Sequence, residues 1–467
     1  MRYAQAIPVS SSTPGYIQSL TGSDAVKWTN SSSPRLGEAA TVRYTFSDVS
    51  WGNYFNYPNE QPLNITQRQA ALQAMEEWSN VANITFVQSA PELAEMAFRE
   101  YDLPSGVAGL AVYSFFGGAL IDAEISFDSY QDSYYPSGYG YSVILHEVGH
   151  ALGLKHPGDY NAGDDEAEGP FLEDFGLVDN TDVSVMSYYD GDYTGPGNYN
   201  TTPMVYDIAA LQYLYGANTS FNAGKTEYKL TTATAAITRW DGGGTDTLNA
   251  RGVDYAKIIL DLREGVDYPT TVGNHVSWNA LGANIENAEG GLGDDVLMGN
   301  EHDNVLIGHS GNDRMMAGQG DDKLKGANGN DRLHGGPGQD IVVGDDGNDT
   351  LYGGSGNDRM SGDNGNDTLY GEAGNDFLYA GRGVDVLIGG SGSDRFIFEN
   401  NSTRVTVSDF EVGTDYLQYR YDDVSEAQAL SGASQSGGSA VLDVAGTQII
   451  LTGVDLDDLS NADFMWG

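Results

Sequence analysis

The sequence predicts an α+β domain followed by an all-β domain of stacked repeats, and three observations predict this order. The first is a histidine motif, His146-Glu147-Val148-Gly149-His150, followed by a third histidine, His156. The second is a nine-residue repeat that runs from residue 290 to residue 397, in twelve copies without an insertion. The third is that helix signals end at Gly216, after which glycine, charge and short β-type runs dominate.

Length and composition limit the number of domains and the kinds of partner that the chain can have. The 467 residues suffice for two or more domains, at about 150 residues per domain. The net charge of -45, from 22 basic and 67 acidic residues, argues against nucleic acid or an anionic membrane as partner and favours bound cations. The absence of cysteine excludes disulfides and thiolate ligands, so calcium could stabilise the fold instead. No secretory signal is evident over residues 1–13, and no apolar run of about 18 residues predicts membrane insertion.

The elements of the first domain are predicted in chain order. Residues 1–35 are rich in Ser, Thr, Pro and Asn and are expected to wrap loosely over the surface. Thr66 is expected to cap a helix that runs to about Asn80, with an apolar stripe facing the core. Ser142 is expected to cap a buried helix over residues 143–152. Other elements are expected as strands at 41–46, 84–87, 96–99, 109–115 and 123–127, and as a helix from Asp207 to Tyr215 that Gly216 ends.

The histidine motif predicts one zinc site. On a helix, His146 and His150 lie on one face one turn apart, where two neutral imidazoles can share an ion. Glu147 lies beside the first ligand and could act as general base on a metal-bound water. His156 can reach the same ion only if the helix stops, and Gly153 stands where that stop is needed. A lone histidine is usually structural, but several fixed positions within eleven residues, among them a glycine with a geometric role, favour the zinc site.

The repeat predicts stacked coils that bind calcium. The eighth position is apolar in all twelve copies, from Leu297 to Phe396, so stacked copies could share one interior. If two copies make one coil, copies n and n+2 are neighbours. The sixth position is Asp in eleven copies and Asn304 in the other. Glycine turns place carbonyl oxygens beside these carboxylates, which is the ligand set that calcium prefers. A solvated acidic face or a disordered tail would not need the apolar eighth position.

The calcium ligands expected within the repeats are the glycines and aspartates of its turns. They are Gly291, Gly293, Asp295, Gly308, Gly311, Asp313, Gly320, Asp322, Gly326, Gly329, Asp331, Gly335, Gly338, Asp340, Gly344, Gly347, Asp349, Gly353, Gly356, Asp358, Gly362, Gly365, Asp367, Gly371, Gly374, Asp376, Asp385 and Asp394.

Together these motifs resemble the serralysins, secreted bacterial zinc metalloendopeptidases of the metzincin type that carry a calcium-binding nonapeptide β-roll. The zinc stretch 146–156, the Met186 turn and the repeat occur in that family's order, and the resemblance covers most of residues 40–467. It implies an α+β protease domain, with a mixed twisted sheet plus helices, followed by an all-β parallel β-roll or β-sandwich domain. The implied division begins with a tail at residues 1–35, which could be a propeptide remnant, and a catalytic domain at 36–216. A region leading into the β domain follows at 217–289, then the β-roll at 290–397 and a C-terminal cap at 398–467.

The resemblance also implies roles for single residues. His146, His150 and His156 would bind one zinc ion, Met186 would pack beneath it, and Tyr188 would bind or approach the zinc and stabilise the tetrahedral intermediate. An extended substrate would pair with an edge strand, expected at Gly109, Leu110, Ala111, Val112 and Tyr113. Further calcium ligands would precede the repeat, at Asn222, Gly224, Thr226, Asp241, Gly243, Gly244, Asp246, Asn284 and Glu286.

The implied partners are protein or peptide substrates and a one-step, type I exporter, for a chain secreted as a monomer. The run Asp463-Phe464-Met465-Trp466 is similar to the C-terminal signal that such exporters read. The loop at 161–182 is longer than expected of the family and could alter the edge of the cleft. Two other functions stay open: a calcium-binding adhesin or structural repeat protein with a degenerate zinc domain, and a zinc hydrolase that acts on another amide.

Overall fold

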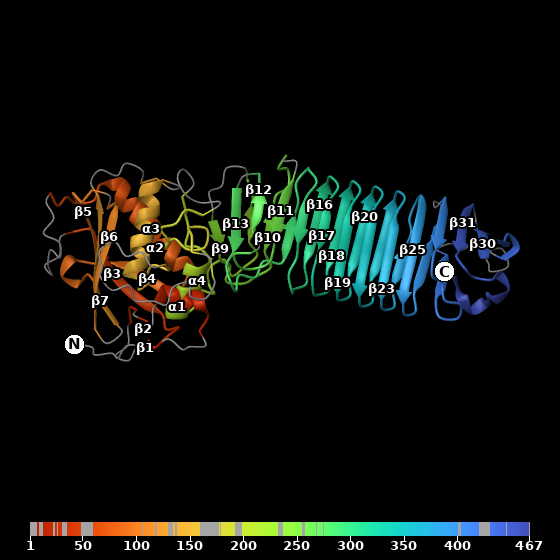
Figure 1. Cartoon of the computed structure of the whole chain (residues 1–467), viewed down its shortest axis with the longest axis horizontal. Coiled ribbons are helices and arrows are strands. Elements are labelled where there is room, and N and C mark those ends of the chain that lie inside the picture. Colours follow the sequence, from red (N-terminus) through yellow and green to blue (C-terminus); the bar gives the residue numbers. More distant parts are fainter. Residues whose placement is uncertain are drawn as a thin grey trace.

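The computed structural model is elongated, with the helices gathered at the N-terminal end and a long stack of strands extending from them (Figure 1). This arrangement confirms the predicted α+β part followed by an all-β part. The structure describes the whole chain apart from residues 1–6, 9–12, 22–23, 26, 30–34, 48–58, 106, 117–118, 129–133, 136–137, 159–176, 178, 192–198, 232–236, 255–256, 268, 274, 400–402, 420–429, 445 and 467.

The α+β part is built on a mixed five-stranded sheet with the strand order β4-β3-β5-β7-β6. Its strands are β3 (Ala40–Thr45), β4 (Ile84–Gln88), β5 (Met96–Tyr101), β6 (Gly109–Phe116) and β7 (Ala119–Asp128). The first four strands in that order pair in parallel, whereas β6 pairs antiparallel with β7 and forms one edge of the sheet. The strands expected from the sequence are therefore confirmed, with small shifts at their ends.

Three longer helices belong to the same part: α2 (Ile65–Val81) and α3 (Tyr139–Ala151), which contact the sheet, and α4 (Val205–Tyr215), which contacts α2. A short 3₁₀ turn, η1 (Pro91–Leu93), precedes β5. Helix α3 contacts α2 on one side and β6 and β7 on another, which explains why it is apolar nearly all round. Helix α4 ends at Gly216, as expected, with φ of +80° at that glycine.

Both predicted N-caps are wrong. Helix α2 is capped by Asn64, whose Oδ1 accepts the Gln67 N–H at 3.0 Å while Gln67 Oε1 accepts the Asn64 N–H at 2.8 Å. This reciprocal capping box satisfies two N–H groups at once, which Thr66 could not do from inside the helix. Helix α3 begins four residues earlier than expected, after Gly138, and the Ser142 hydroxyl donates to Tyr139 O within the first turn.

The expectation that residues 1–35 wrap loosely is wrong for the part that the structure describes. Helix α1 (Gly15–Thr21) packs against α4, and β1 (Ile7–Pro8) pairs with β2 (Asp24–Ala25). Trp28 is buried and its indole N–H donates to Ala151 O at 2.8 Å, at the end of α3. The buried Lys27 ammonium donates to Arg35 O and Glu38 O. A few large buried side chains therefore outweigh the loop-like composition.

The all-β part consists of two sheets that face each other across one core. One sheet has eleven strands: β8 (Glu227–Lys229), β10 (Thr247–Asn249), β14 (Asn287–Glu289), β16 (Val305–Ser310), β18 (Lys323–Asn328), β20 (Ile341–Asp346), β22 (Arg359–Asn364), β24 (Phe377–Tyr379), β26 (Arg395–Phe398), β28 (Tyr416–Tyr419) and β32 (Phe464–Trp466). The other has fourteen: β9 (Ile237–Arg239), β11 (Ile258–Asp261), β12 (Thr270–Val272), β13 (His275–Asn279), β15 (Val296–Met298), β17 (Arg314–Met316), β19 (Arg332–Pro337), β21 (Thr350–Ser355), β23 (Thr368–Ala373), β25 (Val384–Ser391), β27 (Arg404–Val407), β29 (Ser434–Ser436), β30 (Ser439–Val444) and β31 (Thr447–Leu451). Two 3₁₀ turns, η3 (Leu456–Asp458) and η4 (Asn461–Asp463), precede the last strand.

Consecutive copies of the repeat alternate between the two sheets, so each copy pairs with the copy 18 residues away. Leu306 in β16 pairs with Leu324 in β18, and Leu333 in β19 pairs with Leu351 in β21, both in parallel register. All twelve eighth-position side chains are buried in the core between the sheets. The predicted neighbourhood of copies n and n+2 is therefore confirmed, and each coil rests on the next.

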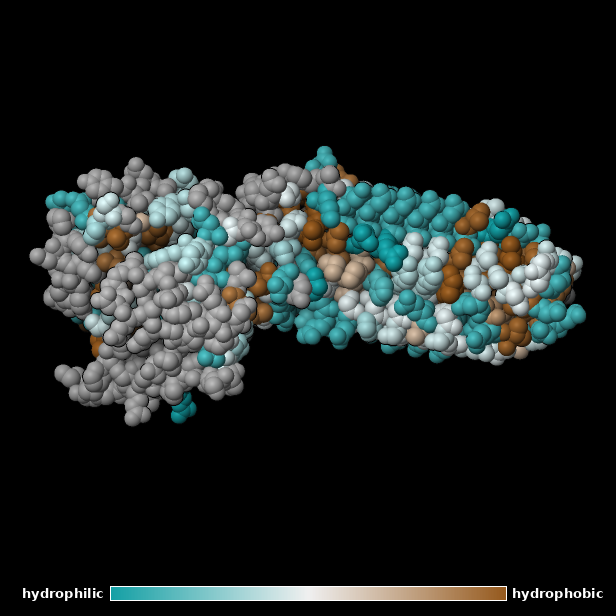
Figure 2. Space-filling model, viewed as in Figure 1, coloured by the Kyte–Doolittle hydropathy of each residue, from teal (hydrophilic) through white to brown (hydrophobic). Residues whose placement is uncertain are grey.

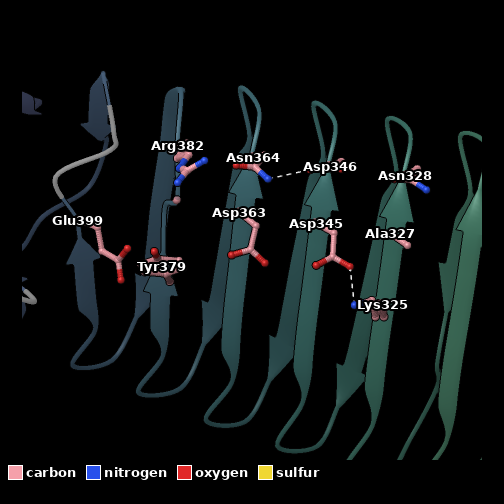
Figure 3. A pocket seen from close by; sticks show the side chains of 11 residues that line it. Lys325, Ala327, Asn328, Asp345, Asp346, Asp363, Asn364, Tyr379, Arg382 and Glu399 are labelled. Carbon is pink, nitrogen blue, oxygen red and sulfur yellow. Dashed lines mark hydrogen bonds and ion pairs between the residues drawn. The ribbon is translucent and has the colours of Figure 1, made fainter.

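The outer surface of the roll is polar. Figure 2 shows a continuous hydrophilic band along one edge of the roll. A groove of about 480 Å³ crosses the ends of β18, β20 and β22 and is lined by both signs of charge (Figure 3). Its charged groups are partly paired, since Lys325 Nζ lies 2.8 Å from Asp345 Oδ2. Among the described residues, no helix has the length and apolar character needed to cross a membrane.

Candidate metal centres and active site

Three histidines converge at the end of α3, as the sequence predicts. His146 and His150 lie one turn apart on the helix, which ends at Ala151. Gly153 then adopts a φ of +100°, and the chain turns back so that His156 faces the other two rings. The Nε2 atoms of His150 and His156 lie 3.0 Å apart, and those of His156 and His146 lie 3.2 Å apart. All three side chains could therefore contribute a ligand to one metal ion.

Backbone carbonyls set the orientation of two of these rings. His146 Nδ1 donates to Val185 O at 2.7 Å, and His150 Nδ1 donates to Leu154 O at 2.8 Å. Burial lowers the pKa of His146 to about 3, and burial also holds the pKa of His150 well below its usual value. Both rings are therefore neutral, with the proton on Nδ1 and the Nε2 lone pair directed at the common centre.

The spacing of the three nitrogens fits a tetrahedral ion. Two nitrogens bound to one tetrahedral zinc at about 2.0–2.1 Å lie roughly 3.3 Å apart. The observed distances of 3.0 Å and 3.2 Å are close to that value. Lone pairs that face one another at such distances repel each other unless a cation or a proton lies between them. The three histidine nitrogens, and the tautomers of His146 and His150, therefore fit zinc.

Glu147 lies beside this centre, against the edge strand β6. The side chain is buried, and burial raises the pKa of its carboxyl group to about 8, although a hydrogen bond from the Ala111 backbone lowers it. A methyl group at Gly109 would lie 2.9 Å from Glu147 Oε1 and 2.5 Å from Val143 Cγ1. The glycine therefore allows β6 to approach α3 closely, and it places Glu147 next to the edge of the sheet. Residues 109–113, expected to pair with substrate, are partly buried along that edge.

Tyr188 and Met186 both lie at the histidine cluster, as expected. The Tyr188 ring centroid is 4.4 Å from that of His156 and 5.5 Å from that of His146. The tyrosine is 52% exposed, and burial of the remainder, together with the Glu147 charge, raises its pKa to about 12. Its hydroxyl therefore keeps its proton at neutral pH and can donate a hydrogen bond.

Met186 packs beneath the helix that carries the histidines. It is fully buried, and a methyl group at Gly149 would lie 2.6 Å from its Sδ atom and 3.1 Å from Trp78 Cζ2. Gly149 therefore allows Met186 and Trp78 to contact the backbone of α3 between the two helical histidines. This contact explains the glycine at position 149 of the motif, for which the sequence alone offered no reason.

Sequence reasoning missed Asp207, a fully buried acid at the start of α4. Its Oδ1 accepts the Ser184 hydroxyl at 2.5 Å, and its Oδ2 accepts the N–H groups of Val185 at 2.7 Å and Met204 at 2.8 Å. Burial raises its pKa to about 7, whereas these hydrogen bonds lower it. The one signal in the sequence was an acid within the apolar run Val205–Leu211, where an unpaired charge would be costly.

The sixth-position aspartates of the repeat, apart from Asp295, each have one satisfied and one unsatisfied oxygen. Both oxygens of Asp295 accept backbone N–H groups, from Ile258 and Gly291. Asp331 Oδ1 accepts the N–H of Asp313, 18 residues earlier, at 2.7 Å. Asp331 Oδ2 is buried and has no hydrogen-bond partner within the described part of the chain. The same holds for Oδ2 of Asp313, Asp322, Asp340, Asp349, Asp358, Asp367, Asp376, Asp385 and Asp394.

Carbonyl oxygens lie beside these unsatisfied carboxylates. A methyl group at Gly326 would lie 2.1 Å from Asp331 Oδ2 and 2.9 Å from Gly344 O, and Gly335, Gly353 and Gly371 have the same surroundings. Burial raises the pKa of Asp331 to about 6 and that of Asp313 to about 8. Buried oxygens of both kinds, with no donor to satisfy them, fit the requirements of calcium.

Most of the ligands expected before the repeat also lie together. Asp246 Oδ1 accepts the Thr226 N–H at 2.6 Å, and Glu286 Oε2 accepts the Asp246 N–H at 2.7 Å. Asp241 Oδ1 accepts the Gly243 N–H at 2.8 Å. The Thr226 hydroxyl lies 3.4 Å from Asn222 O and 3.3 Å from Gly224 O, and a methyl group at Gly244 would lie 2.3 Å from Gly224 O. Asn284, by contrast, is exposed, and residues 161–176 of the longer loop lie outside the described residues.

Comparison with known proteins agrees with both halves of this description. A metallo-peptidase family described as M12B reprolysin-like matches residues 47–157, and the RTX calcium-binding nonapeptide repeat matches residues 289–324, 325–360 and 361–396. Serralysin from Proteus mirabilis is 33% identical over 309 residues, which cover 58% of this chain and 62% of that protein. Metallopeptidase AprA from Pseudomonas marginalis is 37% identical over 297 residues, which cover 57% of this chain and 61% of that protein.

The chain spans about three-fifths of the length of these curated relatives. A solved structure, the extracellular lipase LipA from Serratia marcescens, matches at 20% identity over 41% of this chain and 44% of that one. Its TM-score of 0.22 is too low to carry an argument.

Proposed function

Because the chain is a homologue of the serralysins, we propose that it is a zinc-dependent endopeptidase that hydrolyses internal peptide bonds of proteins. The observation that carries the proposal is the convergence of three imidazoles beside a buried glutamate and the edge of a sheet. His146, His150 and His156 would hold the zinc ion. When bound, zinc would act as a Lewis acid that polarises the scissile carbonyl and makes water more acidic.

Glu147 would act as the general base. Its carboxylate would take a proton from the attacking water and pass that proton to the departing amine nitrogen. Both transfers balance, since the water hydroxyl joins the carbonyl carbon as the C–N bond breaks. The hydrogen bond from the Ala111 backbone would hold the carboxylate in position through both steps.

Tyr188 would stabilise the charge that develops on the carbonyl oxygen. Its raised pKa of about 12 keeps the phenol protonated, so the hydroxyl can donate to that oxygen. The side chain is half exposed, which leaves it room to move toward a bound substrate.

The edge strand β6 would bind the substrate. One side of this strand pairs with β7, and its other side forms the edge of the sheet, where its N–H and C=O groups can pair with an extended peptide. Such pairing recognises the backbone rather than particular side chains, and it would align a peptide beside Glu147. This arrangement favours protein substrates over small amides.

The repeats would bind several calcium ions through their aspartate and glycine oxygens, and folding of residues 290–397 would depend on that binding. Without calcium, the buried aspartates lack partners and repel one another. An ion that binds only the folded form adds its binding free energy to folding. We further propose that the chain is secreted through a type I exporter as an unfolded monomer and folds in the calcium outside.

The proposed activity is tested by digestion of casein with the full chain, before and after treatment with a zinc chelator. We expect cleavage at internal bonds, its loss on chelation and its return when zinc is added. Mapping of the cut sites by mass spectrometry separates an endopeptidase from a hydrolase of other amides. A zinc-loaded chain that leaves casein intact would contradict the proposal.

A further inference from the structure

The sixth-position residues of the repeat form two rows along the roll. Because copies alternate between the sheets, every second copy belongs to the same row. One row runs through Asp295, Asp313, Asp331, Asp349, Asp367 and Asp385, and the other through Asn304, Asp322, Asp340, Asp358, Asp376 and Asp394. The second row therefore starts with an amide where every later member has a carboxylate.

Asn304 is satisfied where the aspartates of its row are not. Its Oδ1 accepts the Asn300 N–H at 2.9 Å. Its Nδ2 donates to Glu286 O at 2.8 Å and to Asn300 Oδ1 at 3.0 Å. Both amide hydrogens of this buried side chain are thus used, whereas Oδ2 of Asp322, the next member of the row, is buried without a partner in the described structure.

The two acceptors of the Asn304 amide are oxygens of the kind that bind calcium. A carbonyl oxygen, Glu286 O, and an amide oxygen, Asn300 Oδ1, face one point that the Nδ2 group fills. An oxygen in place of this nitrogen would face two other oxygens with no hydrogen between them. That arrangement is unfavourable in a buried site unless a cation is present.

Further hydrogen bonds hold the Asn300 side chain, and with it one of these two acceptors, in place. Its Nδ2 donates to Ile285 O at 3.0 Å and to Leu262 O at 3.3 Å, and its Oδ1 also accepts the His302 N–H at 3.0 Å. The first coil of the row is therefore joined to the preceding residues by two amide side chains.

We propose that the Asn304 carboxamide takes the place of a calcium ion at the first coil, so that the ion sites of this row begin at Asp322. The proposal rests on the calcium binding proposed above. It means that the first coil of this row is closed by hydrogen bonds at Asn304 and needs no ion there. The later coils of the row depend on calcium, so the first coil supplies a formed edge on which they can stack.

The test is the calcium content of the full chain and of Asn304→Asp, measured by equilibrium dialysis in millimolar calcium. The substitution exchanges one NH₂ group for one oxygen and leaves the shape unchanged. We expect Asn304→Asp to bind one more calcium ion per chain than wild type. In calcium-free buffer, its thermal unfolding midpoint should fall below that of wild type, and calcium should restore it. An unchanged calcium content, or a variant that calcium fails to restore, would overturn the proposal.

The matched control is Asp340→Asn, the opposite change in the same row. Asp340 Oδ2 is buried and unpartnered, so this variant should lose at least one calcium ion. If Asp340→Asn loses calcium but Asn304→Asp gains none, the role of Asn304 is wrong and calcium binding stands. If wild type itself binds no calcium, the proposed calcium binding and the role of Asn304 are both wrong.

Discussion

Asp207 holds Val185 in place, through a hydrogen bond of 2.7 Å from the Val185 N–H to Asp207 Oδ2. The carbonyl of the same Val185 accepts the proton of His146 Nδ1, also at 2.7 Å. A buried acid on α4 therefore orients a histidine on α3 through the backbone of one residue, Val185. Asp207 also binds the Ser184 hydroxyl, two residues before Met186, so it fixes the turn that carries Met186 and leads to Tyr188.

Asp207→Asn should therefore weaken zinc binding without touching the metal. An NH₂ group at this position would face the Val185 and Met204 N–H groups or the Ser184 hydroxyl, at a cost of about 1–3 kcal/mol of stability. Loss of an outer-shell partner typically reduces metal affinity by about 10–100-fold. Competition with a chromogenic chelator measures this affinity, with the exposed Asp190→Asn as control. Equal zinc affinities for both variants would show that Asp207 has no role in orienting His146.

Glu147→Gln should keep zinc and lose proteolysis. The amide has nearly the same shape but cannot accept a proton, so turnover should fall by at least about 10²–10⁴-fold. Zinc content by atomic absorption and casein cleavage are measured on the same preparation. Wild-type turnover in a zinc-loaded Glu147→Gln chain would rule out the general-base role.

Tyr188→Phe should reduce kcat with little change in KM. The substitution removes only the hydroxyl that is expected to donate to the developing oxyanion, and the ring beside His156 remains. Steady-state kinetics with an internally quenched peptide separate the two constants, and Tyr189→Phe, an exposed neighbour, is the control. A rise in KM alone would assign Tyr188 to substrate binding.

The calcium-free roll should be more stable at pH 6 than at pH 8. Burial raises the pKa of Asp349, Asp367 and Asp385 to about 7, above the usual 3.8. A carboxyl group whose pKa is higher in the folded state binds more protons there, so it loses stability as pH rises through that pKa. Hydrogen exchange of peptides from 326–397 in calcium-free buffer, corrected for the intrinsic rate, measures this directly. Saturating calcium should reduce the difference, and greater protection at pH 8 without calcium would contradict the assignment.

The sequence predicted those parts of the site that depend on local spacing. His146, His150 and Gly153 lie within one helix and its end, so spacing alone implied that His156 turns back. The eighth-position residues follow a strict period, which implied the stacked core and, if two copies make one coil, the pairing of copies n and n+2. In each case, a short segment with one regular geometry determines where the side chains lie.

Other parts depend on contacts between distant segments. The role of Asp207 depends on the contact of α4 with the Met186 turn, in which Val185 lies 22 residues from Asp207 in the chain. The segment with Trp28 has the composition of a loop. Its burial could not be predicted because it depends on a contact with the end of α3, which is distant in the chain. In the sequence, Asn304 is only an exception to the sixth-position aspartate. Its physical role follows from the contacts of its amide with Asn300 Oδ1 and Glu286 O. The cap at Asn64, by contrast, is a local contact with Gln67, and the pattern Asn-x-x-Gln before the apolar stripe was overlooked in the sequence.

The most direct test of the central claim is a zinc titration of the metal-free full chain in calcium, with cleavage of an internal bond in an end-blocked peptide as readout. We predict no cleavage without zinc, a linear rise as zinc is added, and saturation at one ion per chain, while Glu147→Gln binds the same ion and stays inactive. Full cleavage by the metal-free chain, or none at one bound zinc per wild-type chain, would contradict the account.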